Sequence, residues 1–149
     1  AGAGFRGEGM FVDRSGNILG RHKGIIHYTV GQRKGLGIAL GHPVYVNEIR
    51  ADRNEVVLGD EQSLYHRSLL CRDVCFMSIP EMRKEETIRC TVKVRYRHSG
   101  QPAEIAMTES RKVKVTFDDP VRAATPGQSA VFYDAAGCVI AGGIIDEVL

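Results

Sequence analysis

The sequence lacks both of the common glycine-rich loops that hold a nucleotide phosphate. In the glycine-rich stretch GIIHYTVGQRKGLGIALG, residues 24–41, Lys34 precedes Gly35, whereas a P-loop requires Gly-x-x-x-x-Gly-Lys followed by Ser or Thr. The dinucleotide fingerprint Gly-x-Gly-x-x-Gly fails by one residue, because Gly35, Gly37 and Gly41 are spaced Gly-x-Gly-x-x-x-Gly. We therefore expect these glycines to permit tight turns between strands.

Long hydrophobic runs, a cysteine framework and a large net charge are also missing. No apolar run is long enough to span a bilayer, and no charged segment followed by an apolar one marks a signal for export. Four cysteines in 149 residues do not make a disulfide scaffold. We therefore expect a soluble, cytoplasmic protein with no membrane partner. The formal net charge of +2 is too small to argue for nucleic-acid binding by itself.

No set of residues completes a catalytic or metal site. Cys71 and Cys75 have a spacing within the range of zinc sites, and on a strand they could share a face with Asp73, but a structural zinc site needs four ligands. We expect reduced, metal-free core cysteines at these positions and at Cys90 and Cys138. The histidines are scattered, and no serine lies in a Gly-x-Ser-x-Gly turn. The residues by themselves predict a binding module without catalytic residues or cofactor.

Short alternating runs separated by turn residues cover most of the chain. They predict two strands in residues 9–24, one in IIHYTVGQ at residues 25–32, two in residues 43–59, and five or six between residues 86 and 148. Residues 62–77 fit either a helix or a strand. This spacing of short strands indicates an all-β protein.

The polar stretch GDEQS marks a domain boundary. It separates a small β module, expected at residues 1–62, from an antiparallel β-barrel, expected at residues 63–149. A module of about sixty residues is marginal alone, because small domains bury a small fraction of their surface.

The strongest chemical pattern is the predicted strand IRCTVKVRYRHSG. Side chains alternate along a strand, so its cations share one face and its apolar residues share the other. The cations of this face are Arg89, Lys93, Arg95 and Arg97. Across the expected hairpin, SRKVKVTF adds Lys112 and Lys114. A two-strand basic face can follow a phosphate backbone, but the pattern alone favours the alternative, a solvated outer face whose cations protect an edge strand.

Three segments resemble a known family. HYTVGQRKGLGI, RCTVKVRYRH and VTFDDPVRAATPGQSAVFYD with CVIAGGII are similar to the C-terminal half of the tRNA-specific 2-thiouridylases, the MnmA family, from about Gly9 to the end. The resemblance implies a central β module followed by a C-terminal β-barrel. It also implies a parent enzyme that uses ATP and Mg to transfer sulfur to carbon 2 of the wobble uridine of tRNA. Its sulfur would come from a sulfur-relay protein or a cysteine desulfurase.

The catalytic parts of that family are not in this sequence. In the family, an N-terminal ATP-pyrophosphatase domain carries a Ser-Gly-Gly-x-Asp-Ser loop and two catalytic cysteines, and neither feature occurs here. The resemblance therefore implies a tRNA-binding fragment, inactive alone, whose cysteines have no catalytic role. The alternative is a free-standing β-barrel module that binds RNA or protein without catalysis.

The resemblance also implies which residues contact tRNA. The positions of Arg95, Tyr96 and Gln128 do so in the family, and the central module would hold Arg33 and Lys34 toward the tRNA or the mouth of the active site. The strand pattern adds Lys93 and Arg97, because they lie on the same predicted face as Arg95. The expected tRNA-binding residues are therefore Arg33, Lys34, Lys93, Arg95, Tyr96, Arg97 and Gln128.

Overall fold

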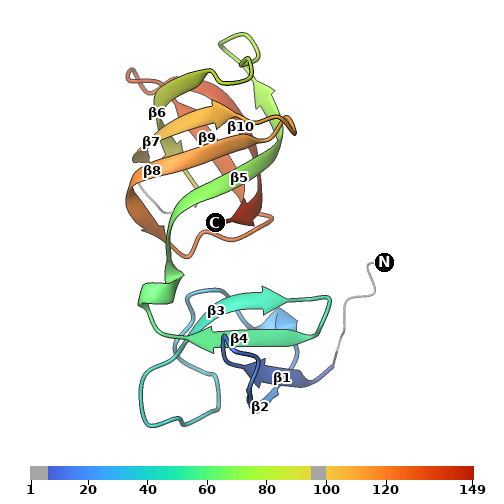
Figure 1. The fold of residues 1–149 in the computed structure, drawn as a ribbon. Helices are drawn as coiled ribbons and strands as arrows, with labels where there is room; N and C mark the ends of the chain where they lie inside the picture. The colour runs from blue at the N-terminus through green and yellow to red at the C-terminus, as the bar shows by residue number, and fades with distance from the viewer. Residues whose placement is uncertain (1–6, 95–99) are drawn as a thin grey trace. The chain divides into compact units, whose positions relative to one another are not determined.

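The computed structural model describes residues 7–94 and 100–149, and these residues are almost entirely strands and loops (Figure 1). The chain divides into two compact units, Ala1–Leu64 and Tyr65–Leu149. The prediction of an all-β protein, with a small β module before an antiparallel barrel, is confirmed. Within the described ranges, no helix is long and apolar enough to cross a membrane.

The first unit is built on a sheet of four short strands. Its strands are β1 (Gly9–Val12), β2 (Ile18–His22), β3 (Tyr45–Arg50) and β4 (Glu55–Gly59). They lie in the order β2-β1-β4-β3, with β1 parallel to β4 and the other neighbours antiparallel. The apolar side chains of β1, β3 and β4 are buried, and Phe11, Val46, Val56 and Leu58 are at most 2% exposed. The apolar positions of these strands therefore form the core of the unit.

Residues 25–32, which the pattern predicts to be a strand, form a 3₁₀ turn and a loop. The short helix η1 covers Ile25–His27, after Gly24 with φ 124°. Tyr28 and Val30 are both buried, as the alternation predicts, but Ile26 of the same predicted face is 82% exposed. The prediction of a strand is wrong because several backbone N–H groups of this segment bond locally, as from Tyr28 to the carbonyl of Ile25, and the bonds of Gly31 and Gln32 to β3 are both made to one residue, Val46.

The second unit is a closed six-stranded barrel. Its strands are β5 (Tyr65–Phe76), β6 (Thr87–Lys93), β7 (Gln101–Met107), β8 (Val113–Arg122), β9 (Ser129–Tyr133) and β10 (Val139–Val148). They close in the order β10-β5-β8-β7-β6-β9, and every neighbouring pair is antiparallel. Residues 62–77 thus comprise a 3₁₀ turn, η2 (Gln62–Leu64), followed by a strand. The barrel core includes Leu69, Ile105, Phe117, Phe132 and Ile145, each at most 1% exposed.

A bulge in β5 places its two cysteines in different environments. Cys71 is fully buried, Cys75 is exposed, and between them Asp73 has a left-handed backbone with φ 52°. The pairing with β10 shifts by one residue at this point, so that Val74 packs against the core. The prediction of one shared face for Cys71 and Cys75 is therefore wrong. Cys138, predicted to be a core residue, is also exposed, because it lies in the turn before β10.

Candidate nucleic-acid interface

The predicted basic strand is β6, and its described part alternates as expected. Cys90, Val92 and Val94 are buried in the barrel core, and Lys93 at the end of β6 is half-buried. Arg95, Tyr96 and Arg97 lie outside the described residues. Lys93 is therefore the one predicted tRNA contact of this segment that the structure describes.

The predicted two-strand basic face does not exist in the form that the sequence suggests. The hairpin partner of β6 is β7, since Thr87 pairs with Ala106 and Val92 with Gln101. Lys112 and Lys114 belong to the region of β8, which lies beyond β7 in the barrel. The prediction is wrong because residues 101–107 form a strand that pairs with β6.

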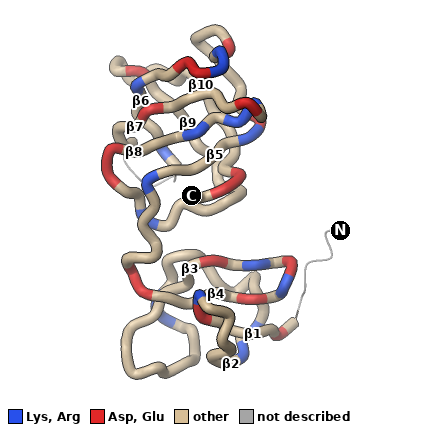
Figure 2. The backbone as a smooth tube through the Cα atoms, in the orientation of Figure 1, with Lys and Arg blue, Asp and Glu red and all other residues tan. Residues whose placement is uncertain are grey.

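Carboxylates neutralise several of the barrel's cations. Arg89 forms an ion pair with Asp118, and Lys112 forms one with Asp146 at 2.7 Å. The hydrogen bond in each pair raises the pKa of the cation and lowers the pKa of the carboxyl group. Basic and acidic residues are accordingly interspersed over the barrel strands (Figure 2). The outer surface is therefore of mixed charge, as the solvated-face alternative anticipates.

Lys93 differs from these cations. Within the described ranges its ammonium group makes no ion pair, and the same holds for Lys114 on β8. Lys93 lies opposite Val131 on β9, and Gln128 immediately precedes that strand. Three residue rises along a strand amount to about 10 Å, so the barrel brings two of the predicted tRNA contacts to the same end of the β6–β9 pair.

Gln128 closes a turn with its own side chain. The N–H of Thr125 donates to Oε1 of Gln128 at 3.1 Å, and the N–H of Gln128 donates to the Thr125 carbonyl at 3.2 Å. Gly127 between them has φ 92°, and its N–H donates to the carbonyl of Ile145 at 2.8 Å. Because Oε1 braces the turn, the side-chain NH₂ group is the part of Gln128 that can bind a ligand.

The first unit contains the same turn at Thr29–Gln32. The N–H of Thr29 donates to Oε1 of Gln32 at 3.0 Å, and the N–H of Gln32 donates back to the Thr29 carbonyl at 3.0 Å. Gly31 has φ 95° and donates to Val46 at 2.8 Å, as Gly127 does to Ile145. The Thr-x-Gly-Gln sequence occurs at both places, so this recurrence is visible in the sequence, although the strand pattern does not reveal it.

This braced turn presents the two predicted contacts of the first unit. Nε2 of Gln32 donates to the carbonyl of Lys34 at 2.8 Å, which fixes the backbone just after the turn. Arg33 and Lys34 are both exposed. A fixed backbone with two exposed cations is suited to contact a phosphate group.

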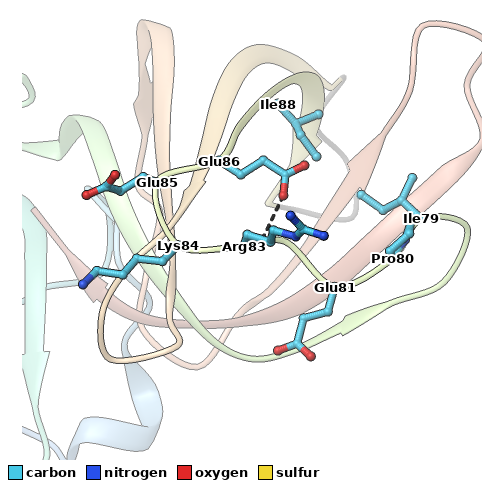
Figure 3. A pocket seen from close by; sticks show the side chains of 8 residues that line it. All are labelled: Ile79, Pro80, Glu81, Arg83, Lys84, Glu85, Glu86 and Ile88. Carbon is cyan, nitrogen blue, oxygen red and sulfur yellow. Dashed lines mark hydrogen bonds between the residues drawn. The ribbon is translucent and has the colours of Figure 1, made fainter.

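A third turn of this kind lies between β5 and β6, with glutamate in place of glutamine (Figure 3). The N–H of Arg83 donates to Oε2 of Glu86 at 2.8 Å, and the N–H of Glu86 donates to the Arg83 carbonyl at 3.0 Å. This loop lines a hollow of about 680 Å³. Three carboxylates, from Glu81, Glu85 and Glu86, also line it, so this loop does not favour a polyanion.

Within the described ranges, no three His, Cys, Asp or Glu side chains gather as ligands for a metal ion. Burial raises the pKa of the Cys71 thiol to about 12 and that of Cys90 to about 11. These two thiols are therefore poor nucleophiles at neutral pH.

Comparison with known families agrees with this architecture. Residues 66–145 match the family model of the aminomethyltransferase beta-barrel domain, and residues 3–60 match that of the tRNA methyl transferase PRC-barrel domain. By class, the barrel is therefore an aminomethyltransferase beta-barrel domain.

Curated relatives identify the family more closely. The tRNA-specific 2-thiouridylase MnmA of Acetivibrio thermocellus is 56% identical over 137 residues, which are 92% of this chain and 37% of the relative. MnmA 1 of Clostridium tetani is 51% identical over 95% of this chain and 38% of its own length, and MnmA of Clostridioides difficile is 47% identical over the same shares. The chain belongs to the tRNA-specific 2-thiouridylase family and matches its C-terminal part. It spans less than two fifths of the length of these relatives.

Proposed function

We propose that this chain is the tRNA-binding part of an ATP-dependent sulfurtransferase that 2-thiolates the wobble uridine of tRNA. The observation that carries the proposal is the identity of 47–56% over more than nine tenths of the chain to proteins named as tRNA-specific 2-thiouridylases. The geometry of the two units supports it, since each presents cations or an amide donor beside a braced turn.

In the barrel, the proposed contact surface is the end of the β6–β9 pair. Lys93 supplies a positive charge for a phosphate, and the NH₂ group of Gln128 supplies a neutral donor for a 2′-hydroxyl or a base edge. From the family resemblance we add Arg95, Tyr96 and Arg97, which lie outside the described residues. In the first unit, Arg33 and Lys34 add two cations on a fixed backbone.

The remaining parts of the reaction belong to the whole enzyme. We infer that ATP and Mg²⁺ act in its N-terminal domain, and that a sulfur-relay protein or a cysteine desulfurase delivers sulfur there. No residue of this chain is assigned to those steps. We place the enzyme in the cytoplasm, and we expect the 149-residue chain alone to form no 2-thiouridine.

The test is a titration of tRNA against the whole enzyme at several salt concentrations. We expect Lys93→Gln to weaken binding and to reduce the salt dependence by about one counterion, because one phosphate contact is lost. Gln128→Ala should weaken binding with an almost unchanged salt dependence. Lys114→Gln is the matched control, because Lys114 is also a strand lysine without an ion pair in the described ranges but lies on β8.

Two outcomes would contradict the proposal. If Lys93→Gln and Gln128→Ala bind tRNA like the wild type at every salt concentration, the β6–β9 end is only solvated surface. If Lys114→Gln weakens binding as much as Lys93→Gln, the effect is one of total charge and not of a contact at this position.

A further inference from the structure

The glycine-rich loop between the Thr29–Gln32 turn and β3 encloses a hollow of about 460 Å³. Its lining includes Arg33, Leu36, Ile38, His42 and Val44. This volume lies within the range of pockets that hold small organic ligands. The loop is the long connection that enters β3 in Figure 1.

The backbone of the loop accounts for its glycines. Gly35, Gly37 and Gly41 all have left-handed conformations, with φ of 77°, 68° and 81°. A Cβ at Gly37 or Gly41 would meet no atom within 4 Å, so these two glycines are needed for their backbone conformation and not for space. The hydrogen bond from Gln32 to the carbonyl of Lys34 fixes the start of the loop. The hollow is therefore shaped by the backbone before a ligand arrives.

Aliphatic side chains form much of the wall of the hollow. Leu36 and Val44 are 6% and 9% exposed and form its buried side, and Ile38 is half-buried. No charged residue occurs in the sequence from position 35 to position 47. Exposed loops are usually polar, so the concave, uncharged surface of this loop is suited to an apolar part of a ligand.

The rim carries cations and an imidazole ring. Arg33 is exposed at the rim and Lys34 is its exposed neighbour. Nδ1 of His42 lies 3.3 Å from the carbonyl oxygen of Pro43, which can only accept, so Nδ1 carries the proton in the neutral ring and Nε2 is an acceptor. A flat heterocyclic ring with N–H donors, linked to an anion, matches these groups, because the N–H donors suit Nε2 of His42 and the anion suits Arg33 and Lys34.

The charge of the sequence around the loop favours an anionic partner. Residues 14–47 contain no Asp or Glu, and they contain five cations, namely Arg14, Arg21, Lys23, Arg33 and Lys34. The whole chain has a formal net charge of only +2, so positive charge is concentrated in this segment. An apolar protein segment would not need such a rim, whereas a nucleotide pairs a flat ring with a phosphate.

We propose that this hollow binds one unstacked nucleobase of RNA, with Arg33 and Lys34 bonding the adjacent phosphates. The inference rests on the proposed function, and it adds a base-binding site in the first unit to the phosphate and 2′-hydroxyl contacts proposed above. The aliphatic side chains of Leu36, Ile38 and Val44 contact the faces of the ring, and such contacts do not distinguish one base from another.

The test uses the 149-residue chain with two probes of equal charge. The first is a pentauridine RNA, whose bases stack weakly, and the second is the same RNA backbone with all five bases removed. We expect pentauridine to bind at least fivefold more tightly than the abasic strand, and to shift the methyl NMR signals of Leu36, Ile38 and Val44. Ile38→Ala should remove most of this difference, whereas Arg33→Gln should weaken both probes alike.

The matched control is Ile18→Ala, because Ile18 is 68% exposed in the same unit and does not line the hollow. Equal affinity for both probes, or methyl signals that do not move at millimolar pentauridine, would overturn the inference. The loop would then cover another part of the longer protein, or its cations would contact phosphates alone. The proposed function is tested separately by the barrel variants with tRNA, so either proposal can fail without the other.

Discussion

The guanidinium group of Arg89 meets the carboxylate of Asp118 in two parallel hydrogen bonds, Nη1 to Oδ1 at 2.8 Å and Nη2 to Oδ2 at 2.6 Å. Arg67 donates to the backbone carbonyl of the same aspartate at 2.8 Å. One acidic residue of β8 thus engages cations of β6 and β5. An RNA backbone that approaches this surface must compete with a carboxylate that is already in place.

Removal of this carboxylate should strengthen RNA binding. Asp118→Asn removes one negative charge and frees Arg89, so we expect the whole enzyme to bind tRNA severalfold more tightly and with a steeper salt dependence. Asp119→Asn is the control, because it makes the same change of charge at the neighbouring exposed position without freeing Arg89. Equal gains in the two variants would show that only net charge matters.

The carboxyl groups of the barrel's ion pairs should make its stability depend on acid pH. Hydrogen bonds from Arg89 and Lys112 lower the pKa of Asp118 and of Asp146 below the ordinary value of 3.8. Their contribution to stability is complete above that value and is lost as pH falls toward the lowered folded-state pKa. In urea unfolding, Asp118→Asn with Asp146→Asn should lower the midpoint at pH 7 and lessen its fall between pH 5 and pH 2.5.

Lys112→Gln provides the reciprocal test, since it removes the hydrogen-bond donor to Asp146 and leaves the carboxyl group in place, with its ion pair to Arg72 at 3.5 Å. This variant should also lessen the fall of the urea midpoint between pH 5 and pH 2.5. A wild-type urea midpoint that rises as the pH is lowered from 5 to 2.5 would contradict the assigned direction of both pKa shifts.

Gly9 at the start of β1 should not tolerate a side chain. A Cβ there would overlap the carbonyl oxygen of Asn54 and approach Nε2 of His22 to 2.6 Å, and those two groups are hydrogen-bonded to each other at 2.8 Å. We expect Gly9→Ala to destabilise the first unit by about 1–3 kcal/mol, the usual cost of overpacking. Denaturant unfolding should show it, and Gly7→Ala, where a Cβ meets nothing within 4 Å, should unfold like the wild type.

The four thiols should fall into two pairs by reactivity. Burial raises the pKa of Cys71 and Cys90 to about 12 and about 11, whereas Cys75 and Cys138 are exposed. At pH 8 a thiol reagent should therefore label two cysteines quickly and the other two only after unfolding. With Cys75→Ser and Cys138→Ser combined, no fast phase should remain. A third fast thiol in the wild type would refute the assignment.

The domain division at residues 62–63 stays a prediction. We expect residues 63–149 alone to keep the amide NMR spectrum that they have in the full chain, because the closed barrel has a core of its own. Residues 1–62 alone should unfold at a lower denaturant concentration than they do in the full chain. Collapse of the barrel spectrum after truncation would show that the two units fold together.

Local patterns in the sequence predict most of the fold. Alternation and turn residues are properties of neighbouring positions, and they identify the all-β architecture and the buried side of β6. They fail where the pairing of strands determines the structure, as at residues 25–32 and in the choice of the strand that pairs with β6. The bulge at Asp73 also escapes them, because one left-handed residue reverses the alternation that follows.

The sequence likewise predicts only part of the candidate site. Lys93 and Gln128 are found from the strand pattern and the family resemblance, but their placement at one end of the β6–β9 pair follows from the barrel closure. The pairing of Arg89 with Asp118, 29 residues apart, depends on tertiary structure and has no sequence signal of its own.

Deamidation would affect Gln32 and Gln128 differently, although both brace a turn through Oε1. Deamidation would turn either residue into glutamate, and Glu86 shows that a glutamate braces the same turn. A molecule deamidated at Gln128 should therefore keep its melting temperature while the NH₂ donor proposed to contact RNA becomes a negative charge, whereas deamidation of Gln32 would also remove its hydrogen bond to the Lys34 carbonyl. A preparation could pass every test of folding and still have lost affinity, and a mass increase of about one dalton would be its main trace.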